Sequence, residues 1–204
     1  MDKARLHFFA EKAANIGAAA IYGVMVYRVG TDWLETWRLS SLFFLALESA
    51  IMVFFLIRNL PKQTSMQPYD WFVALMATFI PMLLRPTVVV NDTTLLLAMQ
   101  LTGVAVSTVA VLSLNRSFGI VPANRGIKRG GLYRYVRHPI YAGYIITYAG
   151  FILQNLHVQN AAVIALFLIF LILRIFAEEE FLAQDPVYAD YMTKTRWRLF
   201  PGVF

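Results

Sequence analysis

Six long apolar runs, separated by short polar stretches, organise most of the chain. They cover residues 13–29, 39–57, 71–90, 94–114, 140–153 and 158–176. The fourth run has about the ~20 residues that a helix needs to cross the hydrocarbon core of a bilayer. Because lipid offers no partner to a backbone N–H or C=O group, such runs form helices rather than strands. The pattern predicts an all-α, polytopic membrane bundle of five to six transmembrane helices, five if the short first run does not span.

Interruptions within the runs add detail to this prediction. Pro81, Arg85 and Pro86 lie in the third run, so a kinked or broken helix is expected there. Only residues 154–157 separate the last two runs, which predicts a tight antiparallel hairpin. Glu48 lies in the middle of the second run, where an ionisable side chain is rare and often functional. A contact with Arg85, a contact with a polar acceptor headgroup and a structural polar contact are all open for it.

Composition supports the membrane class and excludes several kinds of site. The chain is 59% hydrophobic and only 15% charged, whereas soluble domains have roughly a quarter of their residues charged. It has no cysteine, which excludes disulfides and thiolate catalysis. No set of histidines and carboxylates has metal-ligand spacing, so no metal is expected. The net charge of +6 is concentrated in loops beside apolar runs, a pattern typical of membrane orientation rather than of nucleic-acid binding.

The distribution of Lys and Arg predicts the orientation of the chain. If the N-terminus is cytoplasmic and the chain crosses six times, all but Arg28, Arg38 and Arg85 of the 18 basic residues lie on the cytoplasmic side. This is a strong positive-inside bias. The last four runs keep the same orientation if the first does not span. The loop 115–139 and the tail after Arg174, C-terminus included, are therefore expected in the cytoplasm.

A dense polar segment, residues 131–143, opens directly into the fifth run. Pro139 suits the first turn of a helix, because its missing N–H would be unpaired there anyway. The N-terminus of a helix attracts anions, and Arg137 and His138 add donors beside it. Tyr141 is a further donor, and Gly143 permits close approach of a ligand or of a neighbouring helix. The segment fits a carboxylate or phosphate site, although a plain positive-inside anchor has the same composition.

A second charged cluster lies at the end of the sixth run. Arg174 and Glu178 are four residues apart, so they share a helix face and can pair. Glu178, Glu179 and Glu180 could together bind an amine, a ribose hydroxyl pair or a cationic centre. S-adenosylmethionine combines all of these groups with a carboxylate. A solvated helix end is the alternative for the three glutamates.

The two clusters together resemble the signature of a known family. The strings are Gly131-x-Tyr133-x-x-x-Arg137-His138-Pro139-x-Tyr141-x-Gly143, then Arg174-Ile175-x-x-Glu178-Glu179-x-x-Leu182 and Tyr188-x-x-Tyr191. They are similar to those of the isoprenylcysteine carboxyl methyltransferases, which are related to the membrane phospholipid methyltransferases. The resemblance covers roughly residues 115–201. Asp185-Pro186 stands where the family usually has a Phe-Gly pair, so the packing of the tail is expected to differ.

The resemblance implies a transmembrane bundle that binds S-adenosylmethionine on the cytosolic side and a lipid or lipid-like acceptor from the membrane. The residues that it places at the cofactor are Tyr133, Arg137, His138, Pro139, Tyr141, Gly143, Glu178 and Glu179, and we add Arg116, which could instead only cap its helix. A carboxylate acceptor needs no general base, whereas an amine must arrive unprotonated, so Glu178 or Glu179 is a candidate base. With Arg174 they form the candidate catalytic set.

The chain is interpreted as one transmembrane domain, residues 1–204. Residues 1–114 are expected to form the acceptor side, and residues 115–204 the cofactor-binding region. Two other classes remain open at this point. One is an NADPH-dependent sterol-type membrane reductase, for which the basic loop 125–134 could hold the dinucleotide phosphate. The other is a membrane scaffold without enzymatic activity.

Overall fold

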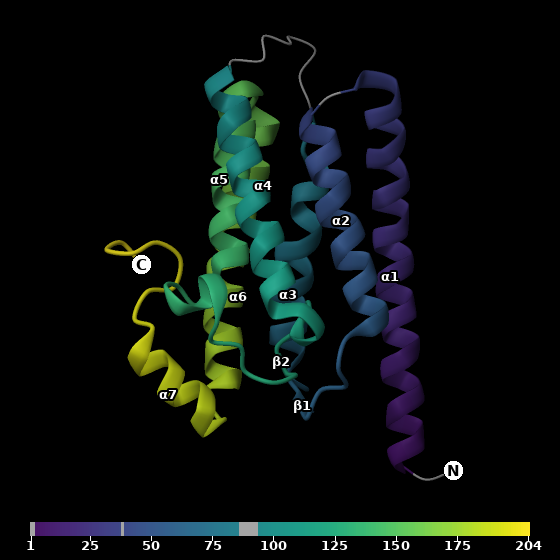
Figure 1. Cartoon of the computed structure of the whole chain (residues 1–204), viewed down its shortest axis with the longest axis vertical. Helices are drawn as coiled ribbons and strands as arrows, with labels where there is room; N and C mark the ends of the chain where they lie inside the picture. The colour runs from purple at the N-terminus through teal and green to yellow at the C-terminus, as the bar shows by residue number, and fades with distance from the viewer. Residues whose placement is uncertain (1–2, 38, 86–93) are drawn as a thin grey trace.

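The computed structural model describes residues 3–37, 39–85 and 94–204, and this part of the chain is mostly helical (Figure 1). Its seven α-helices are α1 (Lys3–Thr36), α2 (Leu39–Ile57), α3 (Pro68–Phe79), α4 (Thr94–Leu114), α5 (Pro139–Gln154), α6 (Val158–Leu182) and α7 (Pro186–Lys194). Short 3-10 helices cover η1 (Ile80–Leu83), η2 (Asn115–Ser117) and η3 (Gly131–Arg134), and β1 (Gln63–Thr64) pairs antiparallel with β2 (Ala123–Asn124).

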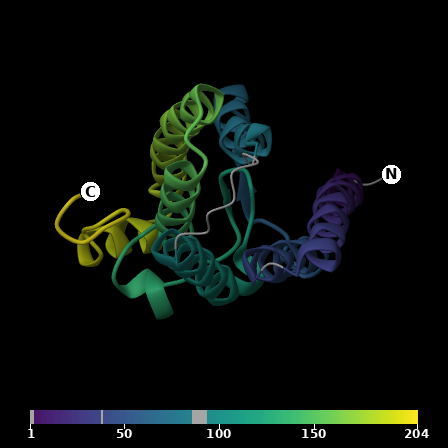
Figure 2. The same cartoon turned by 90° about the horizontal axis from the view of Figure 1, so that it is seen from above.

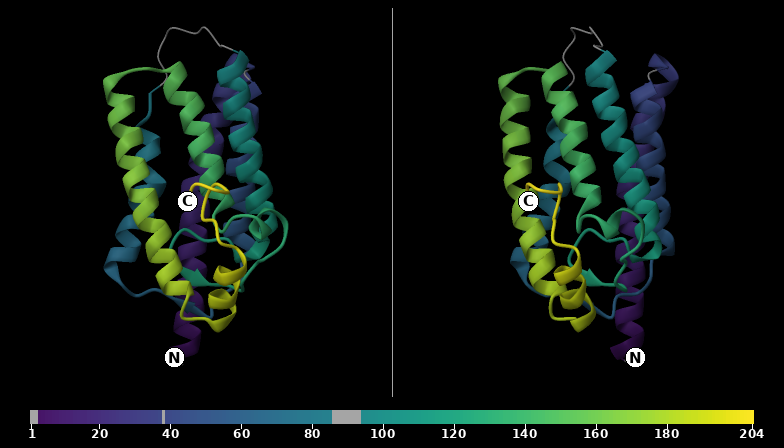
Figure 3. Two further views of the ribbon diagram at one scale, coloured as in Figure 1. Left: turned by 90° about the vertical axis from the view of Figure 1, so that its left-hand side faces the viewer. Right: turned by 60° about the vertical axis from the view of Figure 1, so that its left-hand side comes forward.

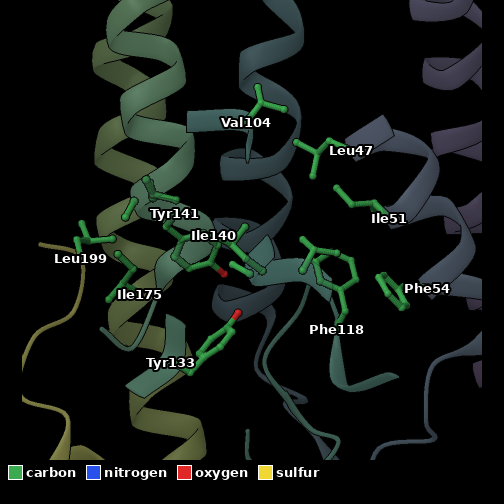
Figure 4. Close-up of a cluster of buried hydrophobic side chains, with 14 of the residues drawn as sticks. Leu47, Ile51, Phe54, Val104, Phe118, Tyr133, Ile140, Tyr141, Ile175 and Leu199 are labelled. Carbon is green, nitrogen blue, oxygen red and sulfur yellow. The ribbon is translucent and has the colours of Figure 1, made fainter. Parts of the chain in front are cut away.

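The long helices stand side by side and form an arc when seen from above (Figure 2). Neighbouring contacts run from α1 to α2, then to α4, α5 and α6, and α3 closes the series by packing against α6. The arc therefore brings the N-terminal helices α1, α2 and α3 around the same interior as the C-terminal helices. A cluster of buried apolar side chains from α2, α4, α5 and α6 fills part of this interior (Figure 4).

The predicted helix boundaries agree closely for several runs. The second and fourth predicted runs coincide with α2 and α4, and α5 begins at Pro139 as expected. The break in the third run is confirmed, because α3 ends at Phe79 and continues as the 3-10 turn η1 around Pro81. Pro86, the other residue predicted to break this run, lies outside the described residues.

Two helices are longer than the apolar runs that predicted them. The first run, 13–29, is only the middle of α1, which has 34 residues. The sixth run ends at Phe176, but α6 continues to Leu182 and carries Glu178 and Glu179 inside the helix. The reason is that helix hydrogen bonding does not require apolar side chains, so hydropathy marks the lipid-facing part of a helix and not its ends.

The hairpin predicted for the last two runs is confirmed. α5 and α6 run antiparallel and are joined by a short connection at one end (Figure 3). The Asn160 amide stabilises this connection by donating to the carbonyl oxygens of Asn155 and Arg85, each at 2.9 Å. Its Oδ1 accepts a 3.1 Å hydrogen bond from the backbone N–H of Arg85. The same side chain therefore ties the end of η1 to the hairpin.

Within the described residues, two helices are long and apolar enough to cross a membrane. They cover Thr94–Ser117 and Val158–Leu182, with mean hydropathies of 2.1 and 2.5, and Ser41–Ile57 and Pro68–Leu83 are shorter apolar helices. Leu112 on α4 and Ile169 on α6 are exposed on the outside of the bundle. A helix in water normally presents a polar outer face, so these apolar outer faces fit a lipid environment.

α4 and α5 cross at small residues. A Cβ atom added at Gly143 would lie 2.6 Å from the carbonyl oxygen of Gly103 and would overlap the Ser107 hydroxyl. A Cβ at Gly103 would overlap the backbone and hydroxyl of Thr147. Helices in membranes use such small residues to bring their backbones together. Of the two reasons expected for Gly143, close approach of a neighbouring helix is therefore the one that the structure shows.

Candidate functional site

One cavity lies inside the arc and is lined by side chains from α1 to α7. The sequence-predicted site residues that line it are Tyr133, Arg137, His138, Tyr141, Arg174 and Glu178. Those that do not line it are Pro139, Gly143, Glu179 and Arg116. The two clusters, 37 residues apart between Tyr141 and Glu178, meet at this cavity because the α5–α6 hairpin folds one back onto the other.

The C-terminal tail holds the segment that precedes α5. The backbone N–H of Arg137 donates to the carbonyl oxygen of Trp197 at 2.9 Å, and that of His138 donates to Arg198 at 2.8 Å. Val136 and Trp197 form a parallel bridge next to these bonds. The tail thereby fixes the backbone of a segment that belongs to no helix, and the side chains of Arg137 and His138 are directed to defined positions.

Glu179 is the ionic centre of this region. Its Oε1 lies 3.0 Å from His138 Nε2 and 3.2 Å from Arg137 Nε, and its Oε2 accepts a 2.9 Å hydrogen bond from Arg198 Nε. The Arg137 contact is an ion pair that lacks hydrogen-bond alignment, which leaves Arg137 Nε without a hydrogen-bond acceptor among the described residues. The carboxylate is almost fully buried. Its oxygens are therefore committed to holding three other side chains in place.

Glu178, the neighbour of Glu179, faces the cavity instead. Its Oε2 accepts a 2.7 Å hydrogen bond from the Tyr141 hydroxyl. The Tyr141 ring stacks nearly parallel on the His138 ring, with centroids 5.3 Å apart. Two adjacent residues of a helix point about 100° apart, which is why one carboxylate reaches the cavity and the next one does not.

Arg174 does not form the ion pair with Glu178 that their spacing on the helix permits. The guanidinium donates to Thr78 Oγ1 at 3.2 Å and to the carbonyl oxygen of Ile120 at 2.6 Å. It also lies over the Tyr141 ring, 5.0 Å from the centroid. The arc of helices places these two partners, one on α3 and one on the loop after η2, within hydrogen-bond reach of this side chain. Its Nε has no acceptor among the described residues.

Arg116 links the ends of two helices through hydrogen bonds. Its Nε donates to the carbonyl oxygen of Ile57 at 2.8 Å, and its own carbonyl oxygen accepts from the N–H of Asn59. These bonds tie the end of α4 to the end of α2. The side chain is therefore occupied away from the cavity, which agrees with a helix-end role and not with a contact to a cofactor.

The cavity also contains residues that the sequence reasoning did not select. They include Tyr22 from α1, Thr78 from α3, and Tyr144 and Tyr148 from α5. Arg125 and Lys128, which belong to the basic loop 125–134 considered for a dinucleotide phosphate, line the cavity as well. The spacing of Tyr141, Tyr144 and Tyr148 by three and four residues is a signal for one helix face and could have found the tyrosines of α5. Tyr22 carries no such signal, because only the tertiary fold brings α1 to the site.

Burial shifts the pKa of two groups in the loops at the cavity. It raises the pKa of the Tyr133 hydroxyl well above its ordinary value, so this group stays a neutral donor. It lowers the pKa of Arg125, an effect that Glu11, at 3.8 Å, opposes. The Tyr133 carbonyl oxygen accepts a 2.7 Å hydrogen bond from the Tyr191 hydroxyl, which joins η3 to α7.

A comparison with protein families supplies the reaction class. The model of the phospholipid methyltransferase family matches residues 88–189, half of the chain, from α4 to α7. The chain belongs to the phospholipid methyltransferase family. This family stands in one group with the isoprenylcysteine carboxyl methyltransferases, so the resemblance drawn from the motifs is confirmed. No curated protein matches the chain.

Membership establishes that the protein is a membrane methyltransferase that uses S-adenosylmethionine as its methyl donor. The family methylates the amines of phospholipids, so a phospholipid acceptor is implied. Family membership therefore favours a methyltransferase over the NADPH-dependent reductase and the non-enzymatic scaffold, the two alternatives that the sequence left open. The match does not include residues 1–87 or the tail after residue 189, and the methyltransferase family model thus says nothing about Glu48 or Arg198.

The residues of the cavity fit this cofactor. S-adenosylmethionine carries a carboxylate, an ammonium, a sulfonium and an aromatic base. Arg174 has a buried Nε without an acceptor among the described residues, which suits a carboxylate, and Arg137 adds a second guanidinium to the cavity lining although its Nε is paired with Glu179. Glu178 offers a carboxylate to a cation, and the Tyr133 and Tyr141 rings supply aromatic surface. We call the part of the cavity formed by Tyr133, Arg137, His138, Tyr141 and Glu178 the cofactor end.

Proposed function

We propose that the protein methylates the amine of a phospholipid headgroup, with the cofactor at the cofactor end and the acceptor entering from the side of α1, α2 and α3. The observation that supports this most directly is the shared cavity. It is lined both by the family-matched residues and by helices that the family model does not cover. Residues 115–204 would then form the cofactor region and residues 1–114 the acceptor side.

In this proposal the chain acts mainly by binding and alignment. Arg137 and Arg174 hold the cofactor carboxylate, and Glu178 binds its positive groups. When bound, S-adenosylmethionine supplies an electrophilic methyl group. Enclosure by the helices excludes water and holds the two reactants in line, which removes much of the entropic cost of the reaction. Pro139 and Gly143 contribute by starting α5 and by setting its distance from α4.

The three residues of the candidate catalytic set take different roles. Glu178 is the one of the three whose carboxylate faces the cavity, so it is the member placed to bind the positive groups of the cofactor. Glu179 is a positioning residue, because its oxygens hold Arg137, His138 and Arg198. Arg174 is anchored by Thr78 and Ile120 and presents its remaining N–H to the cofactor.

We also propose that five or six of the helices α1 to α6 lie across the membrane, five if α1 does not span, with the cavity end near Glu178 and the C-terminus in the cytoplasm. The bias of Lys and Arg supports this orientation. A reporter fused to the C-terminus is expected to be protected from a protease added outside sealed cells. Cleavage of the reporter in intact cells would reverse the orientation.

Binding and transfer experiments test the function. Purified protein in detergent should bind S-adenosylhomocysteine in a calorimetric titration and should not bind NADPH. Protein reconstituted in phosphatidylglycerol vesicles that contain phosphatidylethanolamine should transfer labelled methyl groups to lipid. Vesicles of phosphatidylglycerol alone are the control and should remain unlabelled. Labelling of neither lipid mixture, despite S-adenosylhomocysteine binding, would contradict a phospholipid amine as the acceptor.

A further inference from the structure

A second buried carboxylate faces the cavity from outside the family match. Glu48 belongs to α2 and lines the cavity. Its Oε2 is buried and has no hydrogen-bond donor among the described residues. No Lys, Arg or His in the described part of the chain forms an ion pair with it. A carboxylate in such a place is costly unless something compensates it.

Three tyrosines share the cavity with this carboxylate. Tyr22 of α1 and Tyr144 and Tyr148 of α5 line the same cavity and lie close enough to interact electrostatically with Glu48. Tyr148 is held by an edge contact with Phe167, with ring centroids 5.0 Å apart. We call Tyr22, Glu48, Tyr144 and Tyr148 the acceptor end. A carboxylate among tyrosine rings is a site for an ammonium, because the ring faces attract cations and the carboxylate supplies the countercharge.

The acceptor end is continuous with the cofactor end along one face of α5. His138 stacks on Tyr141 at 5.3 Å between ring centroids, and the Tyr141 and Tyr144 rings are 6.4 Å apart. Tyr148 follows Tyr144 by one helical turn. Glu178 interacts with Tyr141 of this face, and Glu48 interacts with Tyr144 and Tyr148, which follow further along α5. The cofactor and an amine acceptor each carry a positive group, and the cavity provides a carboxylate for each of them.

We propose that Glu48 and its three tyrosines bind the headgroup ammonium of the acceptor phospholipid, and that Glu48 takes the proton that this ammonium must lose. The inference rests on the proposed function and assigns the acceptor half of the site. One N–H bond of the ammonium breaks and its electron pair stays on nitrogen as the lone pair, while the proton forms an O–H bond with the Glu48 carboxylate. The nitrogen is then a nucleophile.

A binding experiment tests this assignment without any turnover. Detergent-solubilised protein saturated with S-adenosylhomocysteine is titrated with dihexanoylphosphatidylethanolamine, and separately with dihexanoylphosphatidylglycerol, which has no amine. Glu48→Gln keeps the size of the side chain and removes its charge. It should weaken binding of the ethanolamine lipid by about tenfold or more, which is about 1.4 kcal/mol. Binding of the glycerol lipid should not change.

Two variants control for structural effects. Glu35→Gln removes an exposed carboxylate from α1 and should leave binding of both lipids unchanged. Tyr148→Phe removes one hydroxyl from the acceptor end and should weaken binding of the ethanolamine lipid by a smaller factor, about threefold. Glu48→Gln should bind S-adenosylhomocysteine within about twofold of the unmodified protein. If it loses this affinity as well, Glu48 is structural and the assignment is wrong; Tyr148→Phe with unchanged lipid binding would overturn it independently.

Activity separates the inference from the function on which it rests. If the unmodified protein methylates phosphatidylethanolamine vesicles and Glu48→Gln does so with the same KM and kcat, the acceptor assignment fails and the proposed function stands. If the unmodified protein methylates no phospholipid amine, both fail. Phosphoethanolamine, the headgroup without acyl chains, should bind much more weakly than the lipid. Equal affinity would identify a soluble amine, and not a lipid, as the occupant.

Discussion

Two buried carboxylates, one in the C-terminal region and one in the N-terminal helices, differ in whether a cationic side chain pairs with them. In the C-terminal region, Glu179 is surrounded by Arg137, His138 and Arg198, and each of these contacts ties one element to another. In α2, Glu48 faces the cavity and has no cationic partner among the described residues. A charge that is already neutralised by the fold stabilises the fold. A charge that the fold leaves without a partner is available to a ligand.

The largest effect is expected for a change at Glu179, the carboxylate that has three cationic partners. Glu179→Gln leaves the shape of the side chain and removes the charge that Arg137, His138 and Arg198 share. Removing one partner from a buried ion pair costs about 3–5 kcal/mol, because the remaining charges stay buried. We expect a much lower Tm and loss of S-adenosylhomocysteine binding, measured by thermal unfolding in detergent and by calorimetry. Glu48→Gln is the matched change and should leave the Tm unchanged or raise it, because it removes a buried charge that no cation compensates; equal losses of stability would remove the contrast.

A glycine-to-alanine change is also expected to have opposite effects on stability in the two regions. Gly143→Ala places a methyl group against the backbone of α4 and should destabilise the protein by about 1–3 kcal/mol, the usual cost of overpacking. A methyl group added at Gly17 of α1 would meet nothing within 4 Å, so Gly17→Ala should stabilise α1 by up to about 1 kcal/mol. Thermal unfolding of both variants measures the difference. A stable Gly143→Ala protein would show that α4 and α5 can separate without cost.

The two ends of the cavity are separated by a pair of tyrosine variants. Tyr141→Phe removes the hydrogen bond to Glu178, worth about 1 kcal/mol, and should weaken S-adenosylhomocysteine binding by about fivefold. Tyr148→Phe, seven residues further along α5, should leave this affinity unchanged. Calorimetric titration of the two variants measures both. If Tyr148→Phe weakens cofactor binding as much as Tyr141→Phe does, the cavity is not divided into a cofactor end and an acceptor end.

The smallest expected effect concerns the start of α7. Asp185 accepts from the Val187 N–H and from Asn124, and these bonds hold the pKa of its carboxyl below the ordinary value. A lowered folded-state pKa means that the stabilisation is present at neutral pH and is lost as pH falls below about 4. Asp185→Asn should therefore reduce the Tm slightly at neutral pH and hardly at all in acid. An equal reduction at both pH values would contradict this origin.

Several features were predictable because they depend on neighbours in the sequence. Hydropathy located α2 and α4 at their observed bounds, and Pro81 and Pro139 marked a helix break and a helix start. The Asp185-Pro186 departure from the family pattern also has a local explanation, since Asp185 caps α7 and Pro186 occupies its first turn. Helix caps and proline effects act within a few residues, so they can be predicted without knowing the fold.

The site was predictable only as a set of residues. Spacing on one helix permits Arg174 to pair with Glu178, but the structure gives Arg174 partners on α3 and on the loop after η2. The motif treated Glu178 and Glu179 as equivalent, although one lines the cavity and the other holds the surrounding cations. Long-range partners decided both outcomes, and a side chain that has several possible partners takes the ones that the tertiary fold brings nearest.

The sequence by itself determined the membrane class, the helices and the methyltransferase motifs, because hydropathy, helix caps and motif chemistry are properties of short segments. The tertiary structure alone decided which carboxylate faces the cavity, which glycine packs against a backbone, and that Tyr22 and Glu48 join a site whose family motif lies more than 80 residues away in the chain. These depend on how the arc of helices closes, since burial and pairing are set by contacts between segments distant in the sequence.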